Sequence, residues 1–146
     1  PEFAACIGEA ELVAGINIGQ QSHKMFGFSY RTEILNDTEG IDHGYKIHLV
    51  YNCLTGVTAR DHTTINESPE LEEMSFDFTA TKVPVTGAKP TAHLVIDTTK
   101  IPAGSEAKLQ TLLDALYGKD ATTEPAAPAT TPKLLMPDEV AAIFAA

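Results

Sequence analysis

Met74-Ser-Phe-Asp-Phe-Thr-Ala80 alternates between apolar and polar residues, as a β-strand with one buried face does. Successive side chains of a strand point to opposite faces of its sheet. The apolar residues, which we expect to face the core, are Met74, Phe76, Phe78 and Ala80. The polar residues on the other face are Ser75, Asp77 and Thr79. That face carries hydroxyls and a carboxylate without a catalytic cluster, which indicates a surface for display or assembly.

Three further segments have the same period of two: residues 26–32, 45–53 and 91–98. In the second of these, the predicted inward residues are Tyr45, Ile47, Leu49, Tyr51 and Cys53. Residues 36–44 are dense in turn formers and predict an exposed loop between the first two strands. The strand that contains Phe76 is expected to extend over 73–84. The sequence therefore predicts a mainly β protein.

A helical period replaces the strand period near the end of the chain. Leu109, Leu112, Leu113, Leu116 and Tyr117 form one apolar stripe, which predicts a helix over about 105–117. Ser105 is the expected N-cap of this helix and Gly118 its C-terminal stop.

Two short helices are expected at the two ends of the chain. Residues 1–15 predict one of them, with Phe3, Ile7 and Leu12 on one side. Pro137, followed by two acidic residues, suits the start of the other. The apolar residues of this second helix would dock on the core of this chain or on that of a neighbour.

Length and composition predict a single globular domain with a tail. The 146 residues are enough for an independent core. Residues 119–132 are rich in Pro, Ala and Thr and predict a linker. We therefore expect a β domain with its flanking helix over 1–120, a linker over 121–132 and a docking segment over 133–146.

The charge of the chain limits its partners. Twenty acidic residues against ten basic ones give a net charge of -10, which repels nucleic-acid phosphate and anionic membranes. Cys6 and Cys53 are far apart and outside any paired motif, so we expect two partly buried thiols in a reducing compartment. The chain begins at Pro1 rather than at Met, so we expect that a native N-terminus has been removed, has been trimmed or lies outside this sequence, and we give little weight to the absence of a leader.

Motifs for catalysis or metal binding are weak. The five histidines (His23, His43, His48, His62 and His93) have no ligand spacing, although His48 and His93 fall on polar strand faces and could be neighbours. The acidic cluster Glu70, Glu72, Glu73 and Asp77 lacks the spacing of a calcium loop and reads as a solvated face. We expect neither catalytic residues nor a cofactor nor a metal.

Four ordered stretches carry a resemblance to a known family. The first is 26–51, which contains Asn36-Asp-Thr-Glu-Gly40 and His43-Gly-Tyr-Lys-Ile-His-Leu-Val-Tyr51. The second is 66–87, which contains Asn66-Glu-Ser-Pro-Glu70 and Pro84-Val-Thr-Gly87. The third is 89–118, which contains Leu94-Val-Ile-Asp-Thr-Thr-Lys100, and the fourth is Leu134-Leu-Met-Pro-Asp-Glu-Val140. Together they cover about 19–144 and resemble the major tail tube protein of long-tailed bacteriophages. The chain departs from the family in having no Trp, with Phe76 and Phe78 in its expected place, and in the turn Gly56-Val-Thr-Ala-Arg-Asp61.

The resemblance implies a fold and a function. Tail tube proteins are β-sandwich or β-barrel subunits with a flanking helix, and they form hexameric rings that stack into a hollow tube. Ser75, Asp77, Thr79 and Thr81 would then face the lumen, where negative charge keeps passing DNA from adhering. The loops 34–44 and 55–70 and the segment after 120 would contact stacked rings. The partners would be copies of this chain and other tail proteins, in the virion after assembly in the bacterial cytoplasm.

Two other classes of function remain open from the sequence. One is a monomeric β-sandwich module that binds carbohydrate or a host surface, although its expected loops lack the aromatic residues such modules expose. The other is a hydrolase that brings His43 or His48 together with a carboxylate. The tube subunit fits the residues best.

Overall fold

The computed structural model describes residues 2–38, 40–56, 76–123 and 126–145. The chain forms two compact units: residues 1–26 with 52–80, and residues 27–51 with 81–146. The fold is mainly β, as the sequence predicted, with short helices. The predicted boundaries at 120 and 132 do not coincide with those of the two units, and they stay a prediction.

A four-stranded antiparallel sheet is the main element of the structure. Strand β3 (Phe26–Asn36) lies beside β4 (Gly40–Thr55), and β6 (His93–Asp97) and β5 (Phe78–Ala80) pair with successive parts of the other side of β4. Leu49 lies opposite Leu94, and Cys53 lies opposite Ala80. The predicted loop over 36–44 is wrong, because β3 continues to Asn36 and β4 already starts at Gly40. Residues 37 and 38 form a turn there instead.

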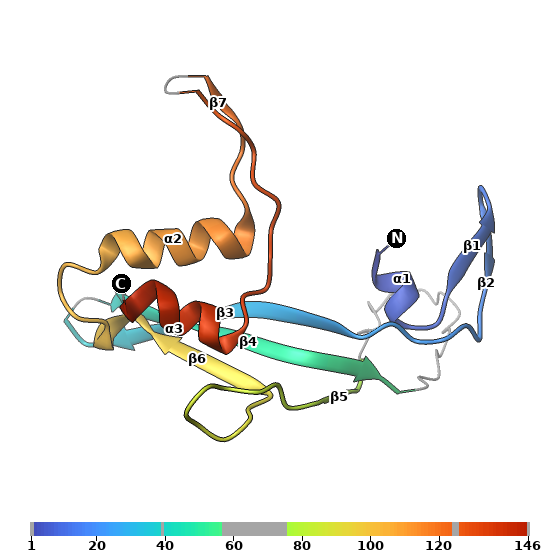
Figure 1. Cartoon of the computed structure of the whole chain (residues 1–146), viewed down its shortest axis with the longest axis horizontal. Helices are drawn as coiled ribbons and strands as arrows, with labels where there is room; N and C mark the ends of the chain where they lie inside the picture. Colours follow the sequence, from blue (N-terminus) through green and yellow to red (C-terminus); the bar gives the residue numbers. More distant parts are fainter. Residues whose placement is uncertain (1, 39, 57–75, 124–125, 146) are drawn as a thin grey trace, which may run out of the picture. The chain divides into compact units, whose positions relative to one another are not determined.

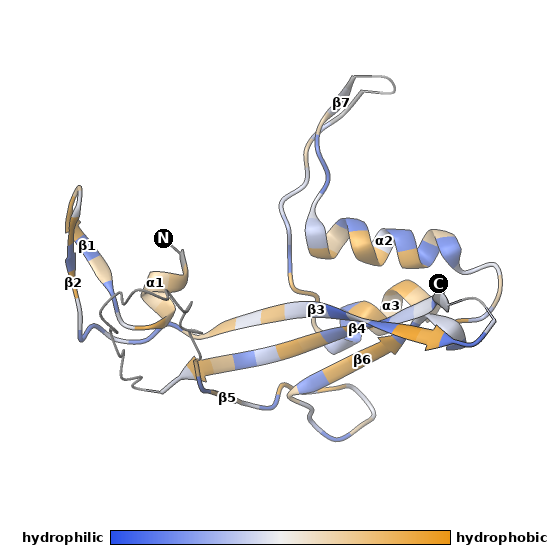
Figure 2. Cartoon of the chain, turned by 180° about the vertical axis from the view of Figure 1, so that it is seen from behind, coloured by the Kyte–Doolittle hydropathy of each residue, from blue (hydrophilic) through white to orange (hydrophobic). Residues whose placement is uncertain are grey.

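The core of the second unit follows the alternation of β4. Ile47, Leu49 and Tyr51 are almost fully buried, as predicted, and Ile96 of β6 joins them. Figure 2 shows the corresponding bands of apolar and polar residues along β4. Burial of these large side chains is the main source of stability in this unit.

Two helices cover one face of the sheet. Helix α2 (Glu106–Tyr117) confirms the predicted 105–117 helix, with Ser105 before it and Gly118 after it at a φ of 74°. Leu112 and Leu116 of α2 and Val140 of α3 (Pro137–Ala145) are buried in the same core as β4. The C-terminal segment therefore docks on its own chain, where α3 lies against α2 and the sheet (Figure 1).

The predicted linker contains a small hairpin. Strands β7 (Thr122–Thr123) and β8 (Ala126–Ala127) are antiparallel, and a further bridge joins Lys119 to Thr130. This ribbon extends away from α2 (Figure 1). The backbone pairing, which composition did not reveal, orders a stretch rich in Pro and Ala.

The first unit holds a short helix, a hairpin and the second part of the sheet. Helix α1 (Glu2–Cys6) ends well before residue 15, and β1 (Ala10–Val13) and β2 (Ile16–Ile18) follow it. The prediction that Leu12 continues a helical face is therefore wrong. Gly15 has a φ of 81° and supplies the turn between these strands.

The predicted strand over 73–84 is much shorter in the structure. Strand β5 covers only Phe78–Ala80. Phe78 remains 43% exposed, so its prediction as a core residue is wrong for the single chain. Met74 and Ser75 lie outside the described residues. None of the helices in the described ranges is long and apolar enough to cross a membrane.

Candidate assembly surfaces

The residues predicted to line a channel are exposed where the structure describes them. Asp77 and Thr79 lie on one stretch of the first unit, two residues apart, and both are exposed. Thr79 lies opposite the exposed Leu54, whereas Phe78 lies opposite the buried Thr55. Phe78 and Thr79 are both exposed, so the predicted alternation of burial is absent at these residues. Thr81, also exposed, follows β5 and belongs to the second unit.

Four phenylalanine rings form a cluster in the first unit. The ring of Phe3 lies 5.9 Å from that of Phe26 and 5.3 Å from that of Phe76, and Phe26 lies 6.1 Å from Phe78. All three contacts are edge-on, the arrangement that aromatic pairs favour. Phe78 thus packs against Phe26 while 43% of its surface remains exposed.

The β1–β2 hairpin exposes large apolar side chains to water, and this exposure does not stabilise a single chain. Leu12, Val13 and Ile16 are 64%, 56% and 55% exposed. Ile18 is the fourth exposed apolar residue of the hairpin. An isolated two-stranded hairpin is marginally stable in water, and a contiguous exposed apolar patch marks an interaction site.

The sheet of the second unit has a face without helices, which we call the open face and define by Tyr30, Thr32, His48, His93 and Val95. The rings of Tyr30 and His48 are parallel, with centroids 4.4 Å apart. His48 Nδ1 lies 3.1 Å from His93 Nε2, and its Nε2 lies 2.9 Å from the Thr32 hydroxyl. The expectation that these two histidines are neighbours is confirmed.

Strands β3 and β6 are the two edges of this sheet around β4. An edge strand can pair with a strand of another chain. β3 is eleven residues long, which makes it the longer of the two edges.

His43 and His23 each have a described hydrogen-bond partner. The ring of His43 bonds to the Asn36 side-chain amide at 2.8 Å. His23 Nδ1 lies 3.0 Å from the Thr55 carbonyl oxygen, and the Thr55 hydroxyl donates to the Cys6 carbonyl. Neither of these contacts joins an imidazole to a carboxylate, as a hydrolase would need. His62 and the acidic residues Glu70, Glu72 and Glu73 lie outside the described residues.

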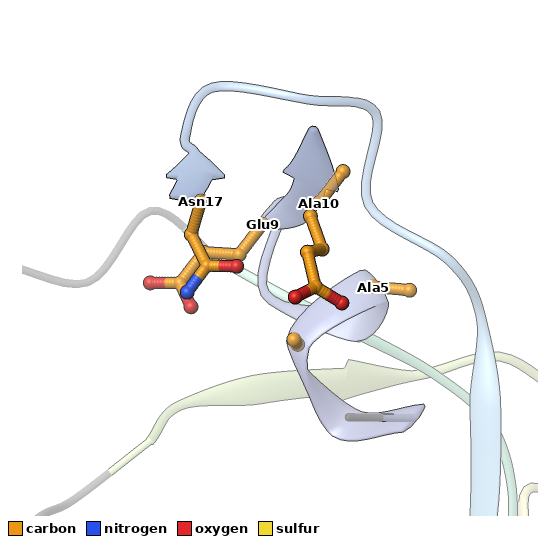
Figure 3. A pocket seen from close by; sticks show the side chains of 6 residues that line it. Ala5, Glu9, Ala10 and Asn17 are labelled. Carbon is orange, nitrogen blue, oxygen red and sulfur yellow. The ribbon is translucent and has the colours of Figure 1, made fainter. Parts of the chain in front are cut away.

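A shallow hollow of about 490 Å³ lies between α1 and the hairpin. Its polar lining comes from Glu9, Glu11 and Asn17, and Figure 3 shows the Glu9 and Asn17 side chains in the same space. A Glu11 carboxylate oxygen accepts a hydrogen bond from the Gly15 amide at the hairpin turn. This lining combines two carboxylates with one side-chain amide.

The chain has two buried cysteines, and two carboxyl groups of α3 have lowered pKa values. Cys6 and Cys53 are both buried and are not joined in a disulfide, as predicted, and burial raises the pKa of Cys53. Hydrogen bonds from Thr86 lower the pKa of Asp138, and the Lys133 ammonium lowers that of Glu139. Within the described ranges, no group of three or more potential ligands is arranged for a metal ion.

Sequence reasoning missed the hairpin as a candidate surface. Its signal was available, since Ala14-Gly15 separates two short runs of β-branched and apolar residues. The weak helical spacing of Phe3, Ile7 and Leu12 competed with that signal. No family model matches the chain, and no curated protein or solved structure is significantly similar to it.

Proposed function

We propose that this chain is the structural subunit of a bacteriophage tail tube, which assembles into stacked rings around a channel for DNA. The observation that carries the proposal is the apolar surface that the β1–β2 hairpin leaves exposed. Leu12, Val13 and Ile16 would lose water contact only when another chain covers them. A protein made to assemble with many copies of itself supplies that covering chain.

The sheet supports the same proposal through its edges. β3 and β6 each have one neighbour in the four-stranded order, so each offers its outer side for pairing between copies. Pairing of this kind would extend the sheet around a ring. The sandwich or barrel of the tail tube type would then be completed by neighbouring subunits, in rings that are hexameric by the resemblance.

The charge of the chain suits a channel for nucleic acid. The exposed Asp77, with Thr79 and Thr81, is our candidate for the lumen surface, together with Ser75. A net charge of -10 keeps phosphate from adhering, so DNA would pass without specific binding. The role is non-enzymatic and needs no cofactor. It belongs to the virion tail, after assembly with other tail proteins in the host cytoplasm.

A monomeric module for carbohydrate or a host surface is the second candidate. The exposed ring of Tyr30 on the open face favours it, because an aromatic ring on an accessible sheet face can stack against a sugar. The exposed apolar hairpin has no role in that function, which is why we place it second.

Negative-stain electron microscopy of the purified chain over a range of concentrations tests the proposal. Rings or tubes that appear as concentration rises are the expected result. Compact monomers at every concentration, with Tyr30-dependent retention on a carbohydrate resin, would favour the second candidate instead.

A further inference from the structure

We propose that His48 and His93 form a two-histidine site on the open face for a divalent transition-metal ion, with Cu²⁺ bound most tightly. His48 lies within β4 and His93 is the first residue of β6. In the register His48 faces Val95 and Val50 faces His93, so the two imidazoles are diagonal neighbours on adjacent strands. The inference is independent of the proposed function, because the pair lies within one unit of one chain.

The distance between the two nitrogens fits ligation of one ion. His48 Nδ1 and His93 Nε2 are 3.1 Å apart. Two nitrogens at about 2.0–2.1 Å from a metal in neighbouring coordination positions are separated by roughly 2.9–3.4 Å. To bind a shared ion, each ring would have to turn within its own plane until its lone pair points at the ion instead of at the other nitrogen.

Thr32 supports the required tautomer of His48. Its hydroxyl lies 2.9 Å from His48 Nε2 and can accept the proton of that nitrogen. The lone pair of Nδ1 then points toward His93. A hydrogen bond to the second ring nitrogen is the usual support of a metal-binding histidine.

The neighbouring aromatic ring fixes the imidazole plane. Tyr30 lies parallel to His48 with an angle of 3° between the rings, and the His48 and His93 rings are within 6° of parallel. Such preorganisation reduces the entropy lost on binding.

The hydrogen bond between the two rings determines which proton has to move when an ion binds. In the unloaded pair one ring nitrogen donates a proton to the other. Binding needs that proton to move from His93 Nε2 to Nδ1, with no net release and no change of oxidation state.

The ligands select the class of ion. Imidazole nitrogens suit Cu²⁺, Ni²⁺ and Zn²⁺, whereas Mg²⁺ prefers oxygen, and the order of affinities puts Cu²⁺ first. The open face carries no helix, so water can occupy the other coordination positions.

Titration of metal-stripped protein without a polyhistidine tag tests the site. We expect calorimetry to show one tight Cu²⁺ site per chain, and electron paramagnetic resonance to show coupling to imidazole nitrogen. Mg²⁺ should give no signal. His48→Asn and His93→Asn should each weaken the tight site by roughly 100-fold, because each removes one arm of a chelate.

Two further variants separate ligation from general effects on the surface. Thr32→Val should keep the site but weaken it by about 10-fold, as loss of a supporting hydrogen bond does. His43→Asn removes a histidine that bonds to Asn36 in the same sheet, and it should leave the tight site unchanged. A tight site that survives in both His48→Asn and His93→Asn, each folded by circular dichroism, would overturn the proposal. Equal affinity in wild type and His48→Asn would also overturn it.

Discussion

The hydroxyl of Tyr51 is a buried polar group in the core of the second unit. It donates to the Leu135 carbonyl at 2.9 Å, while its ring is 1% exposed. Tyr51→Phe keeps the ring and leaves that carbonyl without its donor. We expect the free energy of unfolding to fall by about 1–3 kcal/mol, the usual cost of a buried unsatisfied group. Urea denaturation measures this, and Tyr117→Phe, at a residue that is 53% exposed, is the matched control.

The Tyr51 hydroxyl should also make the free energy of unfolding depend on pH in the alkaline range. Burial, and to a lesser extent Glu139, raises the pKa of Tyr51 to about 12 from an ordinary value of 10. A raised pKa stabilises the folded state fully below pH 10, and this contribution is lost as pH rises toward 12. The stability difference between wild type and Tyr51→Phe should therefore shrink over that range. A difference that stays constant would contradict the assigned cause.

Phe78 is partly exposed and Leu112 is fully buried, so replacing each with Ala should reduce stability by different amounts. Leu112 is fully buried, so Leu112→Ala should cost about 2–5 kcal/mol through the lost contacts and the cavity. The sequence alone predicted a core-sized cost of about 3–5 kcal/mol for Phe76→Ala and Phe78→Ala. Because Phe78 is 43% exposed, we now expect Phe78→Ala to cost clearly less than Leu112→Ala. Thermal melting of the two variants checks the order, and an equal cost would show that Phe78 is buried in solution.

The hairpin is the element that most directly tests assembly. Leu12→Asp removes an apolar contact and adds a charge at a position that is 64% exposed, so the folded chain should persist. We expect self-association to fall at least tenfold in sedimentation velocity, because a charge buried at an interface is costly. Asn17→Asp adds the same charge to the same hairpin and serves as the control. Unchanged association in Leu12→Asp would exclude the hairpin as a contact surface.

Helix α3 is held at its N-terminus by carboxylates. Asp138 accepts hydrogen bonds from the Thr86 amide and hydroxyl, and Glu139 accepts one from the Met136 amide. The Thr86 bonds lower the pKa of Asp138, and Lys133, followed by the Met136 amide, lowers the pKa of Glu139. The stability that these contacts supply is therefore present above the ordinary carboxyl range and is lost as pH falls below it. Melting temperatures between pH 7 and 3 should fall less steeply in Asp138→Asn than in wild type. Thr86→Val should reproduce that shallower slope, and a wild-type slope in both would contradict this role.

The elements differ in how far the sequence could predict them. The inward residues of β4 and the stripe of α2 were predictable, because each has a clear period and a long run. The turn at residues 37 and 38 was predicted as part of a longer loop, since turn residues such as Asn36 and Gly40 can also end and start strands. The β7–β8 ribbon was missed because backbone pairing, rather than side-chain pattern, defines it.

At the scale of the whole molecule, the net charge can be read directly from the sequence, whereas the surfaces that contact other molecules depend on the fold. The exposure of Asp77 and Thr79 was predictable, but Phe78 between them is exposed too, because its burial depends on which elements cover it. The open face was predictable only in part, because the closeness of His48 and His93 required the register of β4 with β6. The function that we propose at this scale would depend on copies of the chain, and the proposal rests on exposed apolar residues rather than on a motif.

Asp77→Lys tests the charge of the proposed channel. Asp77 is exposed, so we expect the variant to fold and to form tubes of normal length by electron microscopy. If the residue faces the lumen, each ring then carries several added positive charges, which attract phosphate over about one Debye length, roughly 8–10 Å. DNA delivery, measured as infectivity and as potassium efflux during ejection, should fall. Asp120→Lys makes the same change at another exposed aspartate and should leave delivery normal. Normal delivery by Asp77→Lys tubes would place this residue away from the DNA while leaving assembly itself untouched.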